Sequence, residues 1–109
     1  MTGERVRYMY LFVMFDLPVT SKAERQAANR FRNFLKSDGY DMLQYSVYTR
    51  ICRGQDAVDK HVRRLKKVVP ESGGIRVFQI TDKQYARMLI LAGKQKKHEK
   101  TGTSQLVLL

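Results

Sequence analysis

The chain has 109 residues, of which 21 are Lys or Arg and 10 are Asp or Glu, so its formal net charge at neutral pH is +11. This length fits one domain, and a hydrophobic fraction of 43% is enough for a packed core, which excludes a disordered basic tail. No apolar run approaches the roughly 20 residues of a membrane span, and so strong a positive charge predicts a polyanionic partner, most often nucleic acid.

The single cysteine, Cys52, permits no internal disulfide and fits a reducing compartment. The first residues lack the apolar core of a signal peptide. We therefore expect a cytoplasmic protein without a membrane partner, in which Cys52 is a small residue of the core or of a sheet edge.

The first predicted strand spans residues 8–16 and ends in Asp16. The six residues before this carboxylate are apolar, and Pro18 ends the strand because proline has no N–H to donate to a sheet. A continuous apolar run predicts a central strand that is buried on both faces. Two interpretations of Asp16 stay open, a cap of the turn before the next helix or a chemical role at the carboxyl end of the strand.

A helix is predicted to follow, because Ser21 and Glu24 have the spacing of a capping box and Gly39 suits the position after a helix end. The helical period predicts an apolar face made of Ala23, Ala27, Phe31, Phe34 and Leu35. The opposite side carries Lys22, Arg25, Asn29, Arg32 and Lys36. Cations in such a line suit contact with successive phosphates, which positions a nucleic acid without reading its bases.

The rest of the chain completes an α+β pattern of the ferredoxin-like type, with the order βαββαβ and an additional C-terminal strand. We expect a ferredoxin-like domain over residues 1–92, followed by a basic loop and a dimerisation strand over 93–109. The apolar tail Leu106, Val107, Leu108 and Leu109 needs a cover, such as a sheet edge in a second copy of the chain. The predicted elements are a hairpin of residues 40–43 and 46–52, a loop at 53–55, a helix over 56–69 with Lys60, Arg63, Arg64 and Lys67 on its polar side, a core strand at 75–80, a short helix over 81–91 and a basic loop at 94–100.

Familiar catalytic motifs are missing: there is no Walker loop, no zinc-type Cys/His spacing and no G-x-S-x-G. His61 and His98 stand in basic, polar contexts, which predicts solvated side chains. Seven other acids fall at caps, turns or helix surfaces, so only Asp16 is placed like a metal ligand; they are Glu24, Asp38, Asp41, Asp56, Asp59, Glu71 and Asp82. One carboxylate holds a metal poorly, whereas two copies of Asp16 across a dimer axis would hold it better.

Five segments resemble the second CRISPR-associated protein family, most closely its version from type II systems. They are Phe-Val-Met-Phe-Asp-Leu-Pro-Val-Thr at 12–20, Glu-Arg at 24–25, Arg-Phe-Arg-Asn-Phe-Leu at 30–35, Gly-Tyr-Asp-Met-Leu-Gln-Tyr-Ser-Val-Tyr at 39–48 and Arg-Val-Phe-Gln-Ile-Thr-Asp-Lys-Gln-Tyr at 76–85. The resemblance implies a ferredoxin-like homodimer whose tail strand, Leu106–Leu109, joins the partner's sheet. It also implies a role in spacer acquisition, in which the dimer lies between two dimers of the CRISPR integrase subunit and holds the middle of a DNA duplex.

The same resemblance implies a magnesium-dependent endonuclease in which Asp16 binds the Mg²⁺ ion. Many members of the family have Tyr immediately before this Asp, whereas this chain has Phe15, so any role of that hydroxyl is lost.

Three hypotheses follow. The leading one is a homodimeric scaffold for double-stranded DNA that bridges integrase subunits, with DNA contacts from Lys22, Arg25, Arg32, Lys36, Arg50 and Arg53. The second is a metal-dependent endoribonuclease or endodeoxyribonuclease that uses paired Asp16 carboxylates. The third is an RNA-binding module of the RRM type, which needs exposed aromatic residues on central strands. Phe12 and Phe15 stand in an all-apolar strand and are expected in the core, which disfavours the third hypothesis.

Overall fold

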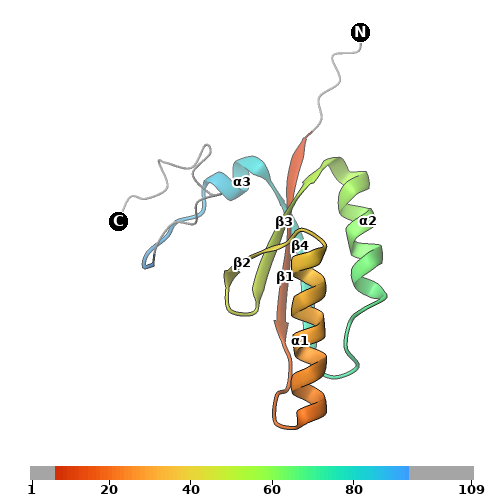
Figure 1. Ribbon diagram of the computed structural model, residues 1–109. Coiled ribbons are helices and arrows are strands. Elements are labelled where there is room, and N and C mark those ends of the chain that lie inside the picture. Colours follow the sequence, from red (N-terminus) through yellow and green to blue (C-terminus); the bar gives the residue numbers. More distant parts are fainter. Residues whose placement is uncertain (1–6, 94–109) are drawn as a thin grey trace.

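The computed structural model describes residues 7–93, which form seven elements in the predicted βαββαβ order followed by a short helix (Figure 1). The α+β class and the ferredoxin-like order are therefore confirmed. The predicted basic loop at 94–100 and the strand Leu106–Leu109 lie outside the described residues. The elements are β1 (Tyr8–Asp16), α1 (Lys22–Ser37), β2 (Asp41–Gln44), β3 (Val47–Arg53), α2 (Gly54–Lys66), β4 (Gly74–Thr81) and α3 (Asp82–Ala86).

The strands form one antiparallel sheet in the order β2-β3-β1-β4, so β1 is a central strand as predicted. In the register, Val13 of β1 is flanked by Tyr48 of β3 and Val77 of β4. Within the described part of the chain, β4 pairs with β1 alone and is therefore a sheet edge. Most residues of β4 are exposed, so the prediction of a core strand holds for its pairing and not for its burial.

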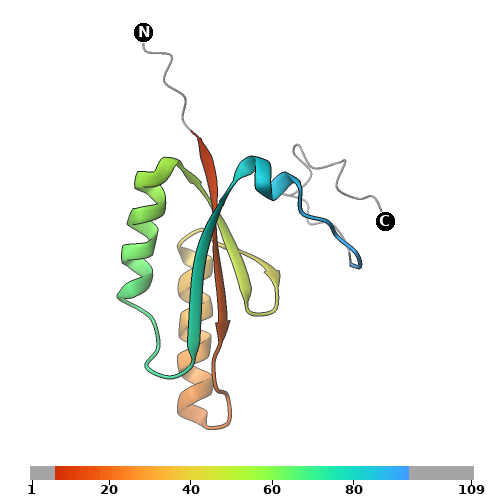
Figure 2. The same ribbon diagram turned by 180° about the vertical axis from the view of Figure 1, so that it is seen from behind.

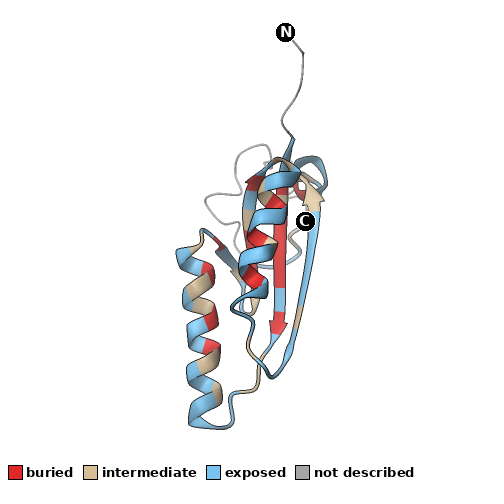
Figure 3. Ribbon diagram, turned by 90° about the vertical axis from the view of Figure 1, so that its right-hand side faces the viewer, coloured by how far each residue is buried: buried red, intermediate tan, exposed pale blue. Residues whose placement is uncertain are grey.

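Helices α1 and α2 cover one face of the sheet, and the main core lies between these two layers (Figure 3). Side chains alternate along β1, so that Leu11, Val13 and Phe15 face the helices. The ring of Phe15 meets that of Phe31 of α1 edge to face, with 5.2 Å between centroids. The remaining buried members of this core are Met9, Leu35, Tyr40, Tyr48, Cys52, Val58 and Leu65.

Neither α1 nor α2 covers the opposite face of the sheet, which we call the open face (Figure 2). Phe12 is buried there because it stacks on Phe78 of β4, at 4.9 Å between ring centroids, and meets the ring of Tyr85 at 6.0 Å. Phe12 and Phe15 are therefore both buried, as predicted, but on opposite faces of the sheet. The prediction that β1 is buried on both faces therefore holds only in part, because Met14 on the open face is 38% exposed.

The ends of α1 follow the prediction. The Ser21 side chain accepts from the Glu24 N–H, and the Glu24 carboxylate accepts from the Ser21 N–H, both at 3.0 Å. Gly39 follows the C-terminal cap at a φ of 91°, a left-handed conformation that favours glycine.

The buried face of α1 is rotated from the predicted one. Its buried residues are Ala28, Phe31 and Leu35, of which the prediction lacked Ala28. Ala23 and Ala27 instead line a groove between α1 and the segment that follows α2, and Phe34 lines this groove while it also packs against the core. The helical period gives the relative angles of the side chains, whereas the sheet determines which of those angles faces the core.

Helix α2 begins two residues earlier and ends three residues earlier than predicted, over Gly54–Lys66 instead of 56–69. There is no loop before it, because Gly54 has a φ of 85° and turns the chain directly from β3 into the helix. Val69 precedes Pro70, and a residue before proline is disfavoured in the helical conformation. Helix α3 also ends before the predicted residue 91, at Ala86.

The hairpin prediction is confirmed within one residue, with Tyr45 and Ser46 forming the turn between β2 and β3. Among residues 7–93, no helix is long and apolar enough to cross a membrane.

Candidate functional site

Asp16 is the last residue of β1 and is exposed. Its position in the alternation of β1 places it on the open face, two residues after Met14. The strand end is held by neighbouring backbone: the N–H of Phe15 donates to the carbonyl of Ser46 at 3.1 Å, and Asp16 pairs with Gly74. The carboxylate is therefore presented to solvent at a fixed point of the sheet.

The donors around Asp16 within one copy do not fit a resident Mg²⁺ ion. In the part of the chain that the structure describes, no three His, Cys, Asp or Glu residues come together in a way that could hold a metal. A single exposed carboxylate leaves a magnesium ion bound almost wholly by water. We therefore derive no chemical step through a metal in the single chain.

Lys22, Arg25 and Lys36 are exposed along α1, as predicted for phosphate contacts. The Nη1 of Arg25 donates to the carbonyls of Val19 and Thr20, at 3.3 Å each, so this guanidinium is oriented by the loop before the helix. These three cations are the part of the predicted line that solvent reaches freely.

Arg32 departs from that line. Its side chain is half-buried, and its guanidinium carbon lies 4.5 Å from the ring centroid of Tyr45 and 5.3 Å from that of Phe15. The rotation of α1 on the sheet explains this, because Arg32 borders the buried Ala28 and comes under the β2–β3 turn.

Arg50 and Arg53 do not form one basic surface with α1. The Nε of Arg50 donates to the carbonyl of Asp38 at 2.7 Å, and its Nη1 donates to the carbonyl of Ile51 at 2.7 Å. Arg50 is thus half-buried and anchors the end of α1 to β3. Arg53 is exposed and pairs across the sheet with Tyr8, which places it on the open face.

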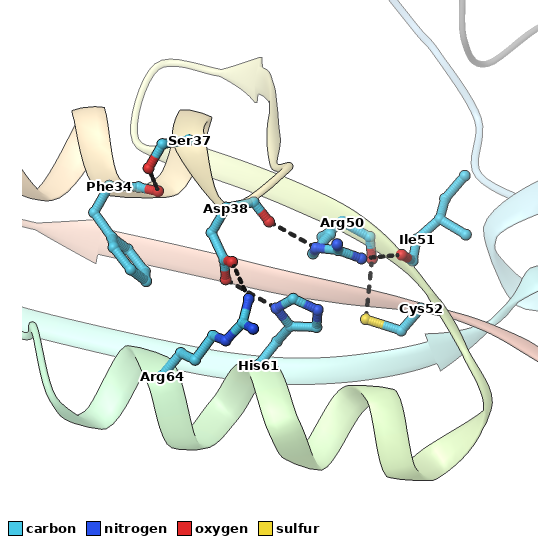
Figure 4. Close-up of polar contacts among 8 residues, drawn as sticks. All are labelled: Phe34, Ser37, Asp38, Arg50, Ile51, Cys52, His61 and Arg64. Carbon is cyan, nitrogen blue, oxygen red and sulfur yellow. Dashed lines mark hydrogen bonds and ion pairs between the residues drawn. The ribbon is translucent and has the colours of Figure 1, made fainter.

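The prediction of a solvated His61 is wrong, because its side chain is buried against Asp38 (Figure 4). The Nδ1 of His61 lies 2.8 Å from Oδ2 of Asp38, and the Nη1 of Arg64 donates to Oδ1 at 2.6 Å. Burial lowers the pKa of His61 and outweighs the raising effect of its hydrogen bond to Asp38. Burial alone would raise the pKa of Asp38, but the hydrogen bonds from His61 and Arg64 outweigh it and lower that pKa.

This polar cluster is far from Asp16. Asp16 precedes the start of α1 and Asp38 follows its end, so a helix of 16 residues, about 24 Å long, separates the two carboxylates. His61 therefore serves as a structural partner of Asp38 and not as an acid or base beside Asp16. The sequence did not predict this cluster. The one signal was Asp38 itself, an acid directly before the Gly39 that follows the end of α1, where a carboxylate can accept hydrogen bonds from neighbouring elements.

Comparisons with known proteins agree with this arrangement. The family model described as "CRISPR associated protein Cas2" matches residues 9–88. A protein of Acidovorax ebreus (strain TPSY) named "CRISPR-associated endoribonuclease Cas2" is 53% identical over 85 residues, which are 78% of this chain and 83% of the relative. A protein of the same name from Paracidovorax avenae is 43% identical over 108 residues, which are 99% of this chain and 98% of the relative.

A solved structure described as "Crystal structure of cas2" superposes with a TM-score of 0.57 at 23% identity, over 83% of this chain and 92% of the solved one. This likeness supports the fold alone. The family match covers β1 through α3 and includes both Asp16 and the Tyr45–Ser46 turn. The chain therefore belongs to the Cas2 family of CRISPR-associated proteins.

Proposed function

We propose that this chain acts in CRISPR adaptation as a homodimeric scaffold that binds double-stranded DNA and bridges integrase subunits during spacer acquisition. The observation that carries the proposal is the division of the surface between two layers. Exposed apolar side chains such as Tyr8 and Ile51 gather on the open face, which also carries the exposed Arg53 and Arg76, whereas α1 and α2 carry a larger number of exposed cations on the other side. A dimer through the open faces would cover the apolar residues and leave both cationic layers free for phosphates.

The open face has the character of a dimer interface. Tyr8, Met14, Ile51 and Phe78 are 47%, 38%, 46% and 42% exposed there. The edge of β4 beside them pairs with no further strand within residues 7–93. An apolar face next to a free strand edge favours association with another chain. We propose a second copy as the cover, with its apolar tail Leu106–Leu109 added to the sheet of the partner.

The oligomeric state tests this surface directly. Ile51→Lys places a charge in the middle of the open face and should give a monomer by light scattering at low micromolar concentration. Val69→Lys is the matched control, because Val69 is 44% exposed but follows α2 on the helix side. The wild type and Val69→Lys should co-elute with the integrase subunit and a short duplex, and Ile51→Lys should not. A dimeric Ile51→Lys protein that still forms this assembly would refute the interface.

The duplex is proposed to lie along α1. Replacing Lys22 and Lys36 by Ala should weaken binding of all duplex sequences alike, and the log–log salt slope should fall by about 1 for each phosphate that the variant no longer binds. Lys83→Ala in α3 removes one lysine charge elsewhere, matching either single α1 replacement, and should leave the slope unchanged. Equal slopes in the α1 variants and the wild type would place the DNA on another surface.

A second candidate function is metal-dependent cleavage of phosphodiester bonds. One observation favours it: Asp16 lies on the open face, so a dimer through this face can bring two carboxylates to one interface. Mg²⁺ is bound in many phosphate-handling sites by one or two carboxylates together with water and phosphate oxygens. Two Asp16 side chains would hold the ion better than one. We propose the scaffold as the main function, because the described part of one copy holds no group of three His, Cys, Asp or Glu side chains that could bind a metal.

A further inference from the structure

Tyr45 is an exposed ring on a fixed support at the turn between β2 and β3. Its side chain is 74% exposed, the largest exposed fraction of any aromatic residue among residues 7–93. Beneath it lies the guanidinium of Arg32, with its carbon 4.5 Å from the Tyr45 ring centroid. The same guanidinium lies 5.3 Å from the ring of Phe15, so the cation is held between two aromatic rings. One face of Tyr45 is thus occupied, and the rest of the ring is open to solvent.

Arg32 has hydrogen-bond donors to spare. A guanidinium carries five N–H donors, and within the described chain the one hydrogen bond of this side chain is from Nη2 to the Ser46 hydroxyl, at 3.4 Å. Its Nε is buried and has no acceptor. No carboxylate forms an ion pair with it among residues 7–93, whereas Arg64 is paired with Asp38. A half-buried cation with unused donors is suited to an anion supplied from outside the chain.

The Arg32–Tyr45 pair lies at the end of the sheet where β1 ends in Asp16. Ser46, the second residue of the turn, has a φ of 70°, which is uncommon for a residue other than glycine. Its carbonyl accepts the N–H of Phe15, the residue immediately before Asp16. The turn is therefore attached to the end of β1, and the ring, the cation and the carboxylate are presented at one end of the sheet.

We propose that Arg32 and Tyr45 form a binding site for an unpaired nucleotide, in which the base stacks on Tyr45 and the phosphate accepts hydrogen bonds from Arg32. Stacking on an exposed ring needs a free base face, and paired bases inside a duplex offer none. The site therefore takes single strands or unpaired ends, whereas the cations of α1 contact the backbone of a duplex. This inference rests on the proposed nucleic-acid role and adds to it a second mode of contact at the end of the sheet that carries Asp16.

The test compares one sequence as single-stranded RNA, single-stranded DNA and duplex DNA, each labelled for fluorescence anisotropy. Tyr45→Ala should lower the affinity for the single strands about tenfold, the effect typical of removing one stacking ring, and leave the duplex affinity unchanged. Tyr45→Phe keeps the ring and should bind like the wild type. The RNA and DNA arms show which kind of strand the site prefers.

Arg32→Ala should weaken single-strand binding. Arg30→Ala is the control that removes the same charge, because Arg30 is exposed on the same helix and Arg32 is the cation that lies over the Tyr45 ring. A 2-aminopurine base in the strand should be quenched by the wild type and not by Tyr45→Ala. Thermal unfolding should show that each variant is folded, which we expect because Tyr45 is exposed.

The outcomes separate this inference from the scaffold proposal. If Tyr45→Ala binds single strands like the wild type, or weakens the duplex equally, the nucleotide site is refuted and duplex binding by α1 stands. A wild-type protein that binds the duplex but no single strand would likewise refute the nucleotide site and leave duplex binding by α1 standing. A wild type that binds neither form overturns both proposals.

Discussion

The Nδ1 of His61 lies 2.8 Å from Oδ2 of Asp38, so a buried side chain of α2 is joined to the residue that ends α1. The Asp38 carboxylate also accepts a hydrogen bond from Arg64, and the backbone carbonyl of Asp38 accepts one from Arg50 of β3. One aspartate thus connects both helices and the sheet. Because an ionised carboxylate only accepts hydrogen bonds, the Nδ1 of His61 carries the proton in this contact.

Asp38→Ala should destabilise the protein by about 2–3 kcal/mol, because it leaves the buried His61 without its partner. Urea unfolding followed by circular dichroism measures this loss. Glu71→Ala is a control for the charge, since Glu71 is exposed in the segment before β4. Equal unfolding free energies for the two variants would show that the Asp38 contacts contribute nothing to stability.

The same cluster should make the fold less stable as the pH falls. Burial holds the pKa of His61 below its usual 6.5, so the unfolded chain takes up the proton first. The stabilisation from neutral His61 is fully present above the pKa that His61 has in the unfolded chain. It is lost as the pH falls from that pKa towards the lower pKa of the folded protein. Asp38 has a lowered pKa as well, so its contribution is present above 3.8 and is lost as the pH falls below that value.

Between about pH 8 and about pH 5.5, proton uptake by His61 should therefore account for most of the change in unfolding free energy that this cluster causes. His61→Gln should unfold at lower denaturant concentration than the wild type at the higher pH, and its stability should depend less on pH across this range. A wild-type slope that persists fully in His61→Gln would assign the pH dependence to another group.

Gly73→Ala should disturb the end of β1 that presents Asp16. Gly73 has a φ of 98°, and a Cβ atom there would lie 2.6 Å from the carbonyl oxygen of Asp16. Strain in the left-handed conformation and this backbone clash together should cost more than about 2 kcal/mol. Gly74→Ala is the matched control, because a Cβ at Gly74 meets nothing within 4 Å. Similar thermal unfolding of both variants would contradict this account.

Local patterns predicted the elements of this fold closely. The apolar run before Asp16 identified β1 with its bounds, and the Ser21–Glu24 spacing identified the start of α1, because both signals act between residues near in sequence. The ends of α2 and α3 were less well predicted. The start of α2 depends on Gly54, whose left-handed conformation turns the chain directly from β3 into the helix, and the Val69–Pro70 pair excludes only the last predicted residue of α2.

The candidate site was predicted less completely than the fold. Asp16 could be picked out because a strand end is visible in sequence. The surroundings of Arg32 could not, because they depend on how α1 is rotated on the sheet and on the turn at Tyr45, 13 residues further along the chain. His61 was misjudged for the same reason, since its partner Asp38 caps the end of another helix, far away in sequence.

Asp16 should matter for cleavage, if the protein cleaves nucleic acid, and not for assembly. Asp16 is exposed and lies outside the buried core of residues 7–93, so Asp16→Asn should fold and form dimers like the wild type. Any cleavage should need Mg²⁺, should be weak because one copy supplies one carboxylate, and should be abolished by Asp16→Asn. The variant should still bind the integrase subunit and duplex DNA and still support spacer insertion. The measurements are cleavage of labelled RNA and DNA with and without Mg²⁺, and insertion of a duplex by the reconstituted complex. Loss of insertion by a folded, dimeric Asp16→Asn protein would overturn the scaffold proposal and favour the nuclease.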